Sequence, residues 1–152
     1  SQNKPFISPC TPKGIMKMLA SIKCDLRGKD CVIIGASNIV GRPMAMELLN
    51  AGATVQVCHK ETKDITQKSK SADVIIAAAG VANLVKSDWV KEGAVIIDVG
   101  INRLEDGTLA GDVDFDDVKD KVSAISPVPG GVGPMTIAVL LENTLTAYQA
   151  RL

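Results

Sequence analysis

The chain of 152 residues has the length of a single domain and can bury a substantial core. Its 17 basic and 17 acidic residues give a formal net charge of zero, so no electrostatic footprint for nucleic acid or for an anionic membrane is visible. Aromatic residues make up 3% of the sequence, which argues against base stacking, and no apolar run approaches the length of a membrane span.

The first predicted helix follows a proline-punctuated entry at residues 9–14. Thr11 followed by Pro12 is typical of a helix N-cap with proline at the first helical position. Apolar residues then recur at the i, i+3, i+4, i+7 spacing of one helix face up to about Ile22. We therefore expect an amphipathic helix before the first strand.

A glycine loop follows the first predicted strand and is the most informative stretch so far. The apolar residues 31–34 favour a buried strand that stops at Gly35, while Gly41 and Pro43 open a helix. The unpaired N–H groups at such a helix start bind anions, above all phosphate. Ser37 stands where the G-x-G-x-x-G pattern has its middle glycine, so its hydroxyl can donate to a phosphate oxygen. The alternative is a turn that only joins a core strand to a core helix.

The rest of the chain alternates predicted strands with predicted helices, which is typical of βαβ units. We expect an α/β fold, a Rossmann-like doubly wound parallel sheet with helices on both faces. The expected strands cover residues 54–58, 74–80, 94–100 and 123–126. The expected helices cover residues 43–50, 62–71 and the acidic stretch 115–122, together with a brief helix capped by Ser87 and a last helix that ends near Arg151. Residues 102–112 are expected to form a loop or hairpin.

Ligands of such sheets lie across the carboxyl ends of the strands, so the segments that follow the strands are the candidates for a site. Residues 127–134 contain three prolines and three glycines, which predicts neither a regular strand nor a helix. Gly130, Gly131 and Gly133 would let backbone lie close to a ligand. The alternative is a rigid turn without a ligand.

Cations follow the second predicted strand, where an NAD site has an Asp or Glu for the ribose hydroxyl. The sequence there is His59-Lys60, with Lys63 nearby, and we expect Glu61 to point to solvent. This pattern favours NADP over NAD. His59 is otherwise a solvent-exposed loop residue, and Arg42 either reaches a phosphate or covers the helix surface.

Four cysteines, Cys10, Cys24, Cys31 and Cys58, form no C-x-x-C pair and accompany one histidine. Neither a zinc site nor a disulfide framework is indicated, and we expect no metal. Cys31 and Cys58 fall in predicted strands, where free thiols behave as small buried hydrophobes. The expected compartment is reducing, hence cytoplasmic, and residues 1–10 lack the apolar core of a signal peptide.

Four blocks stand in order: Pro-Cys-Thr-Pro-Lys-Gly (9–14), Gly-Ala-Ser-Asn-Ile-Val-Gly-Arg-Pro (35–43), Asp-Val-Gly-Ile-Asn (98–102) and Pro-Val-Pro-Gly-Gly-Val-Gly-Pro-Met-Thr (127–136). Together they resemble the bacterial type of the bifunctional methylenetetrahydrofolate dehydrogenase/methenyltetrahydrofolate cyclohydrolase family. The resemblance implies a two-domain, homodimeric enzyme of one-carbon metabolism and purine biosynthesis. It also implies that residues 1–152 are its NAD(P)-binding domain, with the preceding catalytic, tetrahydrofolate-binding domain absent from this chain.

The resemblance also implies roles for individual residues. Some relatives carry arginine at the position of Ala36, where it helps to hold the 2′-phosphate of NADP. The absence of this arginine here weakens the case for NADP. The family's catalytic lysine lies in the earlier domain, so no catalytic residue is expected here. Expected cofactor-binding residues are Gly35, Ala36, Ser37, Ile39, Gly41, His59, Lys60, Gly100 and Ile101, the last at the nicotinamide end, and expected substrate-side residues are Pro129, Gly130, Gly131, Val132 and Gly133.

The function that follows is oxidation of 5,10-methylenetetrahydrofolate by hydride transfer to NADP, then hydrolysis of the methenyl product, with this chain supplying the cofactor half. A nucleotide-binding or regulatory module without catalysis of its own is the alternative, because a fold alone does not fix a function. Asp98 and Asp112 have the chemistry of acid/base groups, but we expect them to be structural, as caps or as hydrogen-bond acceptors for loops.

Overall fold

The computed structural model of the chain describes residues 9–149. Five parallel strands form its central sheet in the order β2-β1-β3-β4-β7, so the predicted α/β, doubly wound architecture is confirmed. The order reverses between β1 and β3, because the chain builds β2 on one side of β1 and β3 on the other. The strands are β1 (Asp30–Ile34), β2 (Thr54–Cys58), β3 (Val74–Ala77), β4 (Val95–Asp98) and β7 (Ala124–Ile125).

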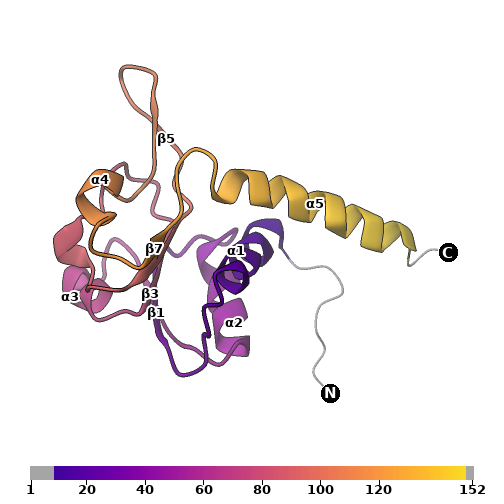
Figure 1. The fold of residues 1–152 in the computed structure, drawn as a ribbon, viewed down its shortest axis with the longest axis horizontal. Coiled ribbons are helices and arrows are strands. Elements are labelled where there is room, and N and C mark those ends of the chain that lie inside the picture. The colour runs from indigo at the N-terminus through magenta and orange to yellow at the C-terminus, as the bar shows by residue number, and fades with distance from the viewer. Residues whose placement is uncertain (1–8, 150–152) are drawn as a thin grey trace.

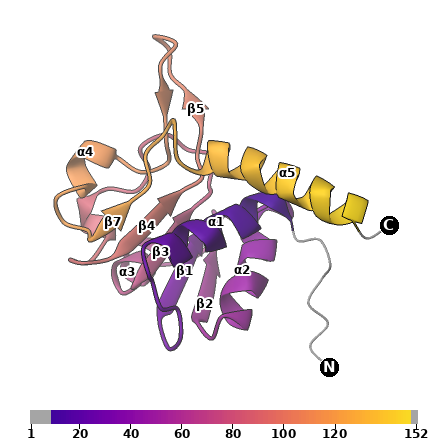
Figure 2. The same ribbon diagram turned by 45° about the vertical axis from the view of Figure 1, so that its right-hand side comes forward.

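Helices cover both faces of this sheet (Figures 1 and 2). One core lies under α1 and α2 and contains Ile33 and Ile76, while the other lies under α3 and α4 and contains Val32 and Ile75. Neighbouring residues of a strand thus point into opposite cores, which is why the strands are continuous apolar runs. The helices are α1 (Cys10–Ser21), α2 (Gly41–Asn50), α3 (Ile65–Lys70), the 3₁₀ helix η1 (Ser87–Trp89), α4 (Phe115–Val118) and α5 (Val132–Gln149).

Two elements project from the sheet layers. The predicted hairpin is present as β5 (Asn102–Arg103) paired antiparallel with β6 (Leu109–Ala110), and it stands out at the upper edge in Figure 2. Helix α5 runs beside α1 and extends past it. It carries exposed apolar side chains at Ile137, Leu140, Leu141, Leu145 and Tyr148.

Several predicted helix boundaries were wrong. Helix α1 begins at Cys10 with Pro9 as its N-cap, so Thr11 is not the cap, and its hydroxyl instead lies 3.1 Å from that of Thr136. Ser87 lies inside η1 and is not its N-cap. Helices α3 and α4 are shorter than predicted, and the predicted end of the last helix at Arg151 lies outside the described residues.

The proline–glycine segment was also predicted incorrectly in its last part. Helix α5 already begins at Val132, so Gly133 and Pro134 belong to its first turn. A proline is tolerated there because the first N–H groups of a helix have no partner within it. The irregular segment is therefore 126–131.

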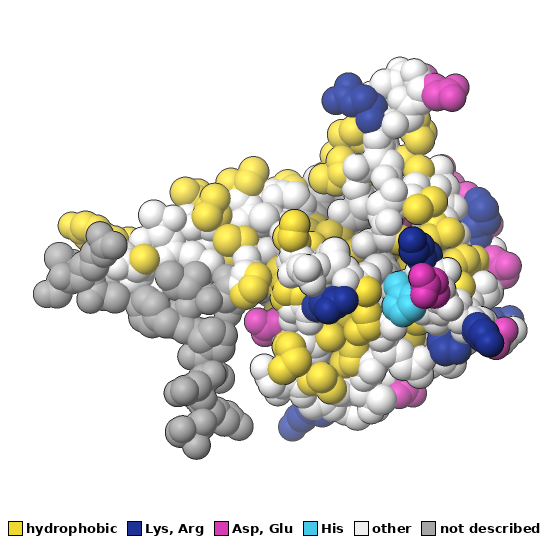
Figure 3. Space-filling view, turned by 180° about the vertical axis from the view of Figure 1, so that it is seen from behind, with side chains coloured by type: hydrophobic (Ala, Val, Ile, Leu, Met, Phe, Trp, Pro, Cys, Tyr) yellow, Lys and Arg dark blue, Asp and Glu magenta, His cyan; other side chains and the backbone are white. Residues whose placement is uncertain are grey.

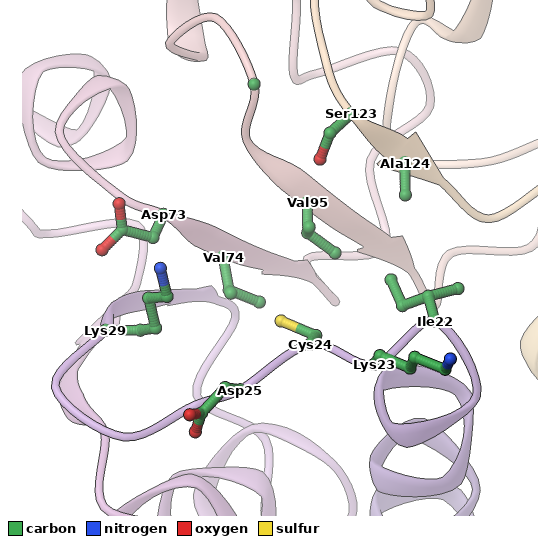
Figure 4. A pocket seen from close by; sticks show the side chains of 11 residues that line it. Ile22, Lys23, Cys24, Asp25, Lys29, Asp73, Val74, Val95, Ser123 and Ala124 are labelled. Carbon is green, nitrogen blue, oxygen red and sulfur yellow. The ribbon is translucent and has the colours of Figure 1, made fainter.

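The amino edge of the sheet holds a cavity of about 600 Å³, larger than any that we describe at the carboxyl edge. Its walls include Cys24, Lys29, Asp73 and Val95 (Figure 4). It lies at the opposite edge from the carboxyl ends of the strands, where ligands of parallel sheets bind.

Asp73 accepts hydrogen bonds from two other segments at this edge. Its carboxylate accepts a hydrogen bond from the Asp30 N–H at 2.9 Å and one from Lys91 Nζ at 2.5 Å. The Lys91 ammonium first, and then the Asp30 N–H, lower the pKa of Asp73 below its ordinary value. The stabilisation is therefore present above the ordinary carboxyl pKa of about 4 and is lost as pH falls through the lowered value.

We expect Asp73→Asn to reduce the free energy of unfolding at pH 7 by about 1 kcal/mol, since the pair is partly exposed. The difference from wild type should shrink as the pH falls below about 4, where the carboxyl of the unfolded chain is protonated, and close once the pH passes below the lowered pKa of the folded chain. Urea unfolding followed by circular dichroism at several pH values measures it, with the exposed Asp120→Asn as control. A difference that stays constant between pH 7 and pH 3 would contradict this assignment.

Candidate functional site

The point where the strand order reverses brings the glycine loop against β3. The Gly35 N–H donates to the Cys58 carbonyl at 2.8 Å, and the Ala78 N–H donates to the Ile34 carbonyl at 2.7 Å. Gly35 has a φ of 120°, and a Cβ on it would collide with the Ala78 carbonyl. Only glycine fits this position, both for its backbone angles and for the space.

The loop also closes on itself. A Cβ on Gly41 would collide with the Gly35 carbonyl, so the start of α2 packs directly on the loop backbone. The Ser37 Oγ accepts the N–H groups of Val40 at 3.2 Å and of Gly41 at 3.4 Å. An oxygen that accepts in this way keeps its own O–H to donate, as a phosphate oxygen over the loop would require.

Arg42 is exposed and contacts the glycine loop. Its Nε donates to the Ala36 carbonyl at 3.2 Å, and its backbone N–H donates to the Ser37 carbonyl at 3.0 Å. The guanidinium therefore holds the loop from the outside.

A cavity of about 490 Å³ opens between this loop and the ends of β2 and β3. It brings together five of the predicted cofactor residues. Apolar side chains form most of its wall, and polar groups lie at its rim. The lining residues are Ile34, Gly35, Ala36, Ser37, His59, Lys60, Thr62, Ile65, Ala78, Ala79, Val81, Leu84 and Trp89.

A tight turn presents Lys60 at this rim. The His59 N–H donates to Thr62 Oγ1 at 2.9 Å, and the Thr62 N–H donates back to the His59 carbonyl at 2.9 Å. The Glu61 N–H donates to His59 Nδ1 at 3.3 Å, so the imidazole is part of the turn. His59 is the cyan side chain in Figure 3, with basic and acidic side chains beside it. Glu61 is exposed and does not line the cavity, as expected.

A second cavity, of about 190 Å³, is lined by most of the remaining predicted residues. It lies between the end of β4 and the start of α5, and its lining includes Gly100, Ile101 and all five predicted substrate-side residues, Pro129 to Gly133. Gly131 is buried, and a Cβ on it would meet the Pro127 carbonyl oxygen. Val132 is 6% exposed, whereas Ile101 is 60% exposed.

Two predicted cofactor residues line neither cavity. The Ile39 side chain is 78% exposed, and Gly41 is buried behind the loop. The sequence analysis in turn missed the apolar wall of the first cavity, formed by Ile65, Leu84 and Trp89. The sequence signal for these residues was that they follow predicted strands, at the edge of the sheet where ligands bind.

Asp98 and Asp112 are buried acceptors of loop hydrogen bonds, which agrees with the structural role expected for them. Within the part of the chain that the structure describes, no group of three or more His, Cys, Asp or Glu side chains is arranged to hold a metal ion. No helix among residues 9–149 is long and apolar enough to cross a membrane.

A glycine loop at the reversal of a parallel sheet, a helix start behind it and an apolar cavity with a basic rim define a dinucleotide-binding domain of the Rossmann type. Residues 9–152 match the family model described as "Tetrahydrofolate dehydrogenase/cyclohydrolase, NAD(P)-binding domain". The chain belongs to this family, which confirms the predicted resemblance.

The sequence and structure of this chain are similar to those of FolD proteins over almost its whole length. It is 62% identical over 151 residues to the bifunctional protein FolD of Vesicomyosocius okutanii, covering 99% of this chain and 54% of that protein. The crystal structure of FolD from Campylobacter jejuni is 64% identical with a TM-score of 0.94, covering 95% of this chain and 51% of that one. The crystal structure of FolD from Trypanosoma brucei, in complex with NADP and an inhibitor, is 39% identical with a TM-score of 0.94, and the match covers 99% of this chain and 53% of that one. The chain thus spans about half the length of these relatives.

Proposed function

We propose that the chain is the NADP-binding half of a bifunctional 5,10-methylenetetrahydrofolate dehydrogenase/methenyltetrahydrofolate cyclohydrolase. The observation that carries the proposal is the first cavity, with the Gly35 loop on one side and Lys60 on its rim. The relative from Trypanosoma brucei was solved with NADP, and it shares the fold of this chain. A regulatory module without catalysis has no specific observation in its favour.

The residues at the carboxyl edge fit a dinucleotide. Glycine at positions 35 and 41 leaves the room that a Cβ would fill, so backbone and the Ser37 hydroxyl can approach a pyrophosphate. The Lys60 ammonium offers a cation for a 2′-phosphate, and among the residues that the structure describes no acidic side chain lines the cavity. Ile65, Leu84 and Trp89 offer an apolar wall to the adenine. When bound, NADP accepts the hydride of the folate, and this chain holds and orients it.

The folate and the cyclohydrolase step belong to a preceding domain in this proposal. The chain covers about half of its relatives, and α5 exposes Leu140 by 55% and Leu141 by 67%, apolar surface that another domain would cover. Among the described residues that line the second cavity, Asp98 is the titratable one, and N–H donors occupy both of its oxygens. It is therefore not available as a proton-transfer group.

We also propose that the whole enzyme is a homodimer in the cytoplasm and serves purine biosynthesis. Free, buried thiols support a reducing compartment, and burial raises the pKa of Cys31 to about 12. The homodimer and the metabolic role rest on the resemblance described above.

Lys60→Ala should weaken NADP binding by about 1.5–3 kcal/mol, roughly 10- to 100-fold in Kd, because a charge-assisted hydrogen bond to the 2′-phosphate is lost. NAD lacks that phosphate, so its Kd should stay within about twofold. Calorimetric titration of both cofactors measures the ratio, with Lys63→Ala, exposed and outside the cavity lining, as the matched control. Equal affinity of the wild type for the two cofactors, or an unchanged ratio in Lys60→Ala, would refute the NADP assignment.

The chain of 152 residues should bind NADP without catalysing hydrolysis of methenyltetrahydrofolate, because no available proton-transfer group lines the second cavity. The whole enzyme should catalyse both steps. The absorbance of the methenyl compound, followed with and without protein, measures the hydrolysis. Turnover above the buffer rate that disappears on mutating a residue of this chain would show that the division of roles is wrong.

Gly131→Val in the whole enzyme should lower the dehydrogenase rate about 10-fold or more while most NADP affinity is kept. The valine Cβ would push against the Pro127 carbonyl and shift segment 126–131 at the second cavity, whereas the first cavity lies elsewhere. Initial rates, NADP titration and thermal melting measure the three properties. Gly130→Ala is not a suitable control, because Gly130 has a φ of 98°. A Gly131→Val enzyme with wild-type melting and wild-type turnover would mean that this segment is only scaffold.

A further inference from the structure

Two buried aspartates lie where three loops of the carboxyl edge meet. Asp98 ends β4 and is 3% exposed, and Asp112 follows the β5–β6 hairpin and is fully buried. Burying an ionised carboxylate is unfavourable unless hydrogen bonds satisfy it. N–H donors from the surrounding loops reach both carboxylates.

Asp112 joins the loop after β3 to the hairpin. Its Oδ2 accepts the N–H groups of Ala79 at 2.6 Å and of Gly80 at 2.9 Å. Its Oδ1 accepts the amide of Asn102, in β5, at 2.9 Å. One carboxylate thus fixes two segments that are more than 20 residues apart in the sequence.

Asp98 joins the end of β4 to the same hairpin and to the segment before α5. Its Oδ1 accepts the N–H groups of Gly100 at 2.9 Å and of Asp112 at 3.0 Å, and its Oδ2 accepts the Val113 N–H at 3.0 Å. Its own N–H donates to Ser126 Oγ at 2.8 Å. Burial raises the pKa of Asp98, while these backbone donors oppose that shift.

Two glycines make room for the carboxylates. A Cβ on Gly100 would collide with the carboxylate of Asp112, and a Cβ on Gly111 would collide with that of Asp98 and lie 2.9 Å from Val128 Cγ2. Each carboxylate therefore lies directly on backbone. This contact is a structural reason for glycine at position 100, beside the cofactor-binding role that the resemblance implies for it.

The segments held in this way line both cavities. Ala79, which donates to Asp112, lines the first cavity, and Gly100, which donates to Asp98, lines the second. Segment 127–133, which follows Ser126, also lines the second. The Asp98–Asp112 pair is thus a buried polar connection between the two halves of the proposed cofactor edge, beside backbone hydrogen bonds such as that of the Asn83 N–H to the Gly111 carbonyl.

We propose that Asp98 and Asp112 are positioning residues that set the second cavity relative to the first, and with it the nicotinamide end of the bound dinucleotide relative to the folate. The inference rests on the proposed function. A misplacement of about 1 Å between reacting groups can cost about 100-fold in rate, so loss of this connection should appear in the hydride-transfer step. Neither aspartate touches the reacting atoms in this assignment.

Asp98→Asn tests it sharply, because all three partners of the carboxylate are backbone N–H groups, which cannot turn to accept from the new amide. In the whole enzyme, single-turnover formation of NADPH should slow about 10-fold or more. The Kd of 2′,5′-ADP, which occupies only the adenosine end, should stay within about twofold. Asp106→Asn, at the exposed hairpin tip, is the matched control and should change neither value.

Asn102→Ala is the second variant, in case Asp98→Asn does not fold. It removes one donor from Asp112 and leaves those of Ala79 and Gly80, so a severalfold slower hydride transfer with unchanged 2′,5′-ADP binding is expected. Rates are measured well below the melting temperature of each variant, so that lower stability alone does not change them. An inactive wild type overturns the proposed function and this inference with it. An active wild type whose folded variants transfer hydride at its rate overturns the inference alone.

Discussion

Backbone packed against backbone at Gly35 is the constraint on which the cofactor edge depends. Its Cα lies against the Ala78 carbonyl, and the Cα of Gly41 lies against the Gly35 carbonyl, so β1, β3 and α2 meet without an intervening side chain. Parallel pairing of β1 with both β2 and β3 brings these segments together where the strand order reverses. The first cavity, the Ser37 hydroxyl and the turn that carries Lys60 are all placed relative to this contact.

The sheet could be predicted from the sequence because β1, β3 and β4 are short apolar runs between polar turns, a strong local signal. Helix boundaries could not be predicted as well, since contacts distant in sequence decide them. Thr11 has the features of an N-cap, but its hydroxyl lies beside that of Thr136, 125 residues away. Pro134 has the features of a helix breaker, but its place in the first turn of α5 requires no donor.

The loops of the candidate site could be predicted from the sequence, but the apolar walls of the first cavity could not. Gly35, Ser37 and Lys60 directly follow strands, and their chemistry can be recognised locally. Leu84 and Trp89 are ordinary apolar residues in the sequence, and only the order of the strands makes them a cavity wall. Gly100 lines the second cavity, and its lack of a side chain also has a reason within the fold, because a Cβ there would collide with the carboxylate of Asp112, 12 positions further on.

The two ends of the carboxyl edge differ in kind, and this difference supports the proposal that this chain binds the nucleotide while another domain completes the reaction. The first cavity combines an apolar wall with a cation and a hydroxyl, the elements that recognise a ligand by themselves. The second cavity is smaller and is lined mainly by glycine, proline and apolar residues, and its titratable group among the described residues, Asp98, accepts three backbone N–H groups. In the proposed function this surface sets distances, and the groups that move protons belong to the preceding domain. A second cavity whose lining supplies no proton-transfer group suits hydride transfer, because the approach of the two reactants controls the rate of that step.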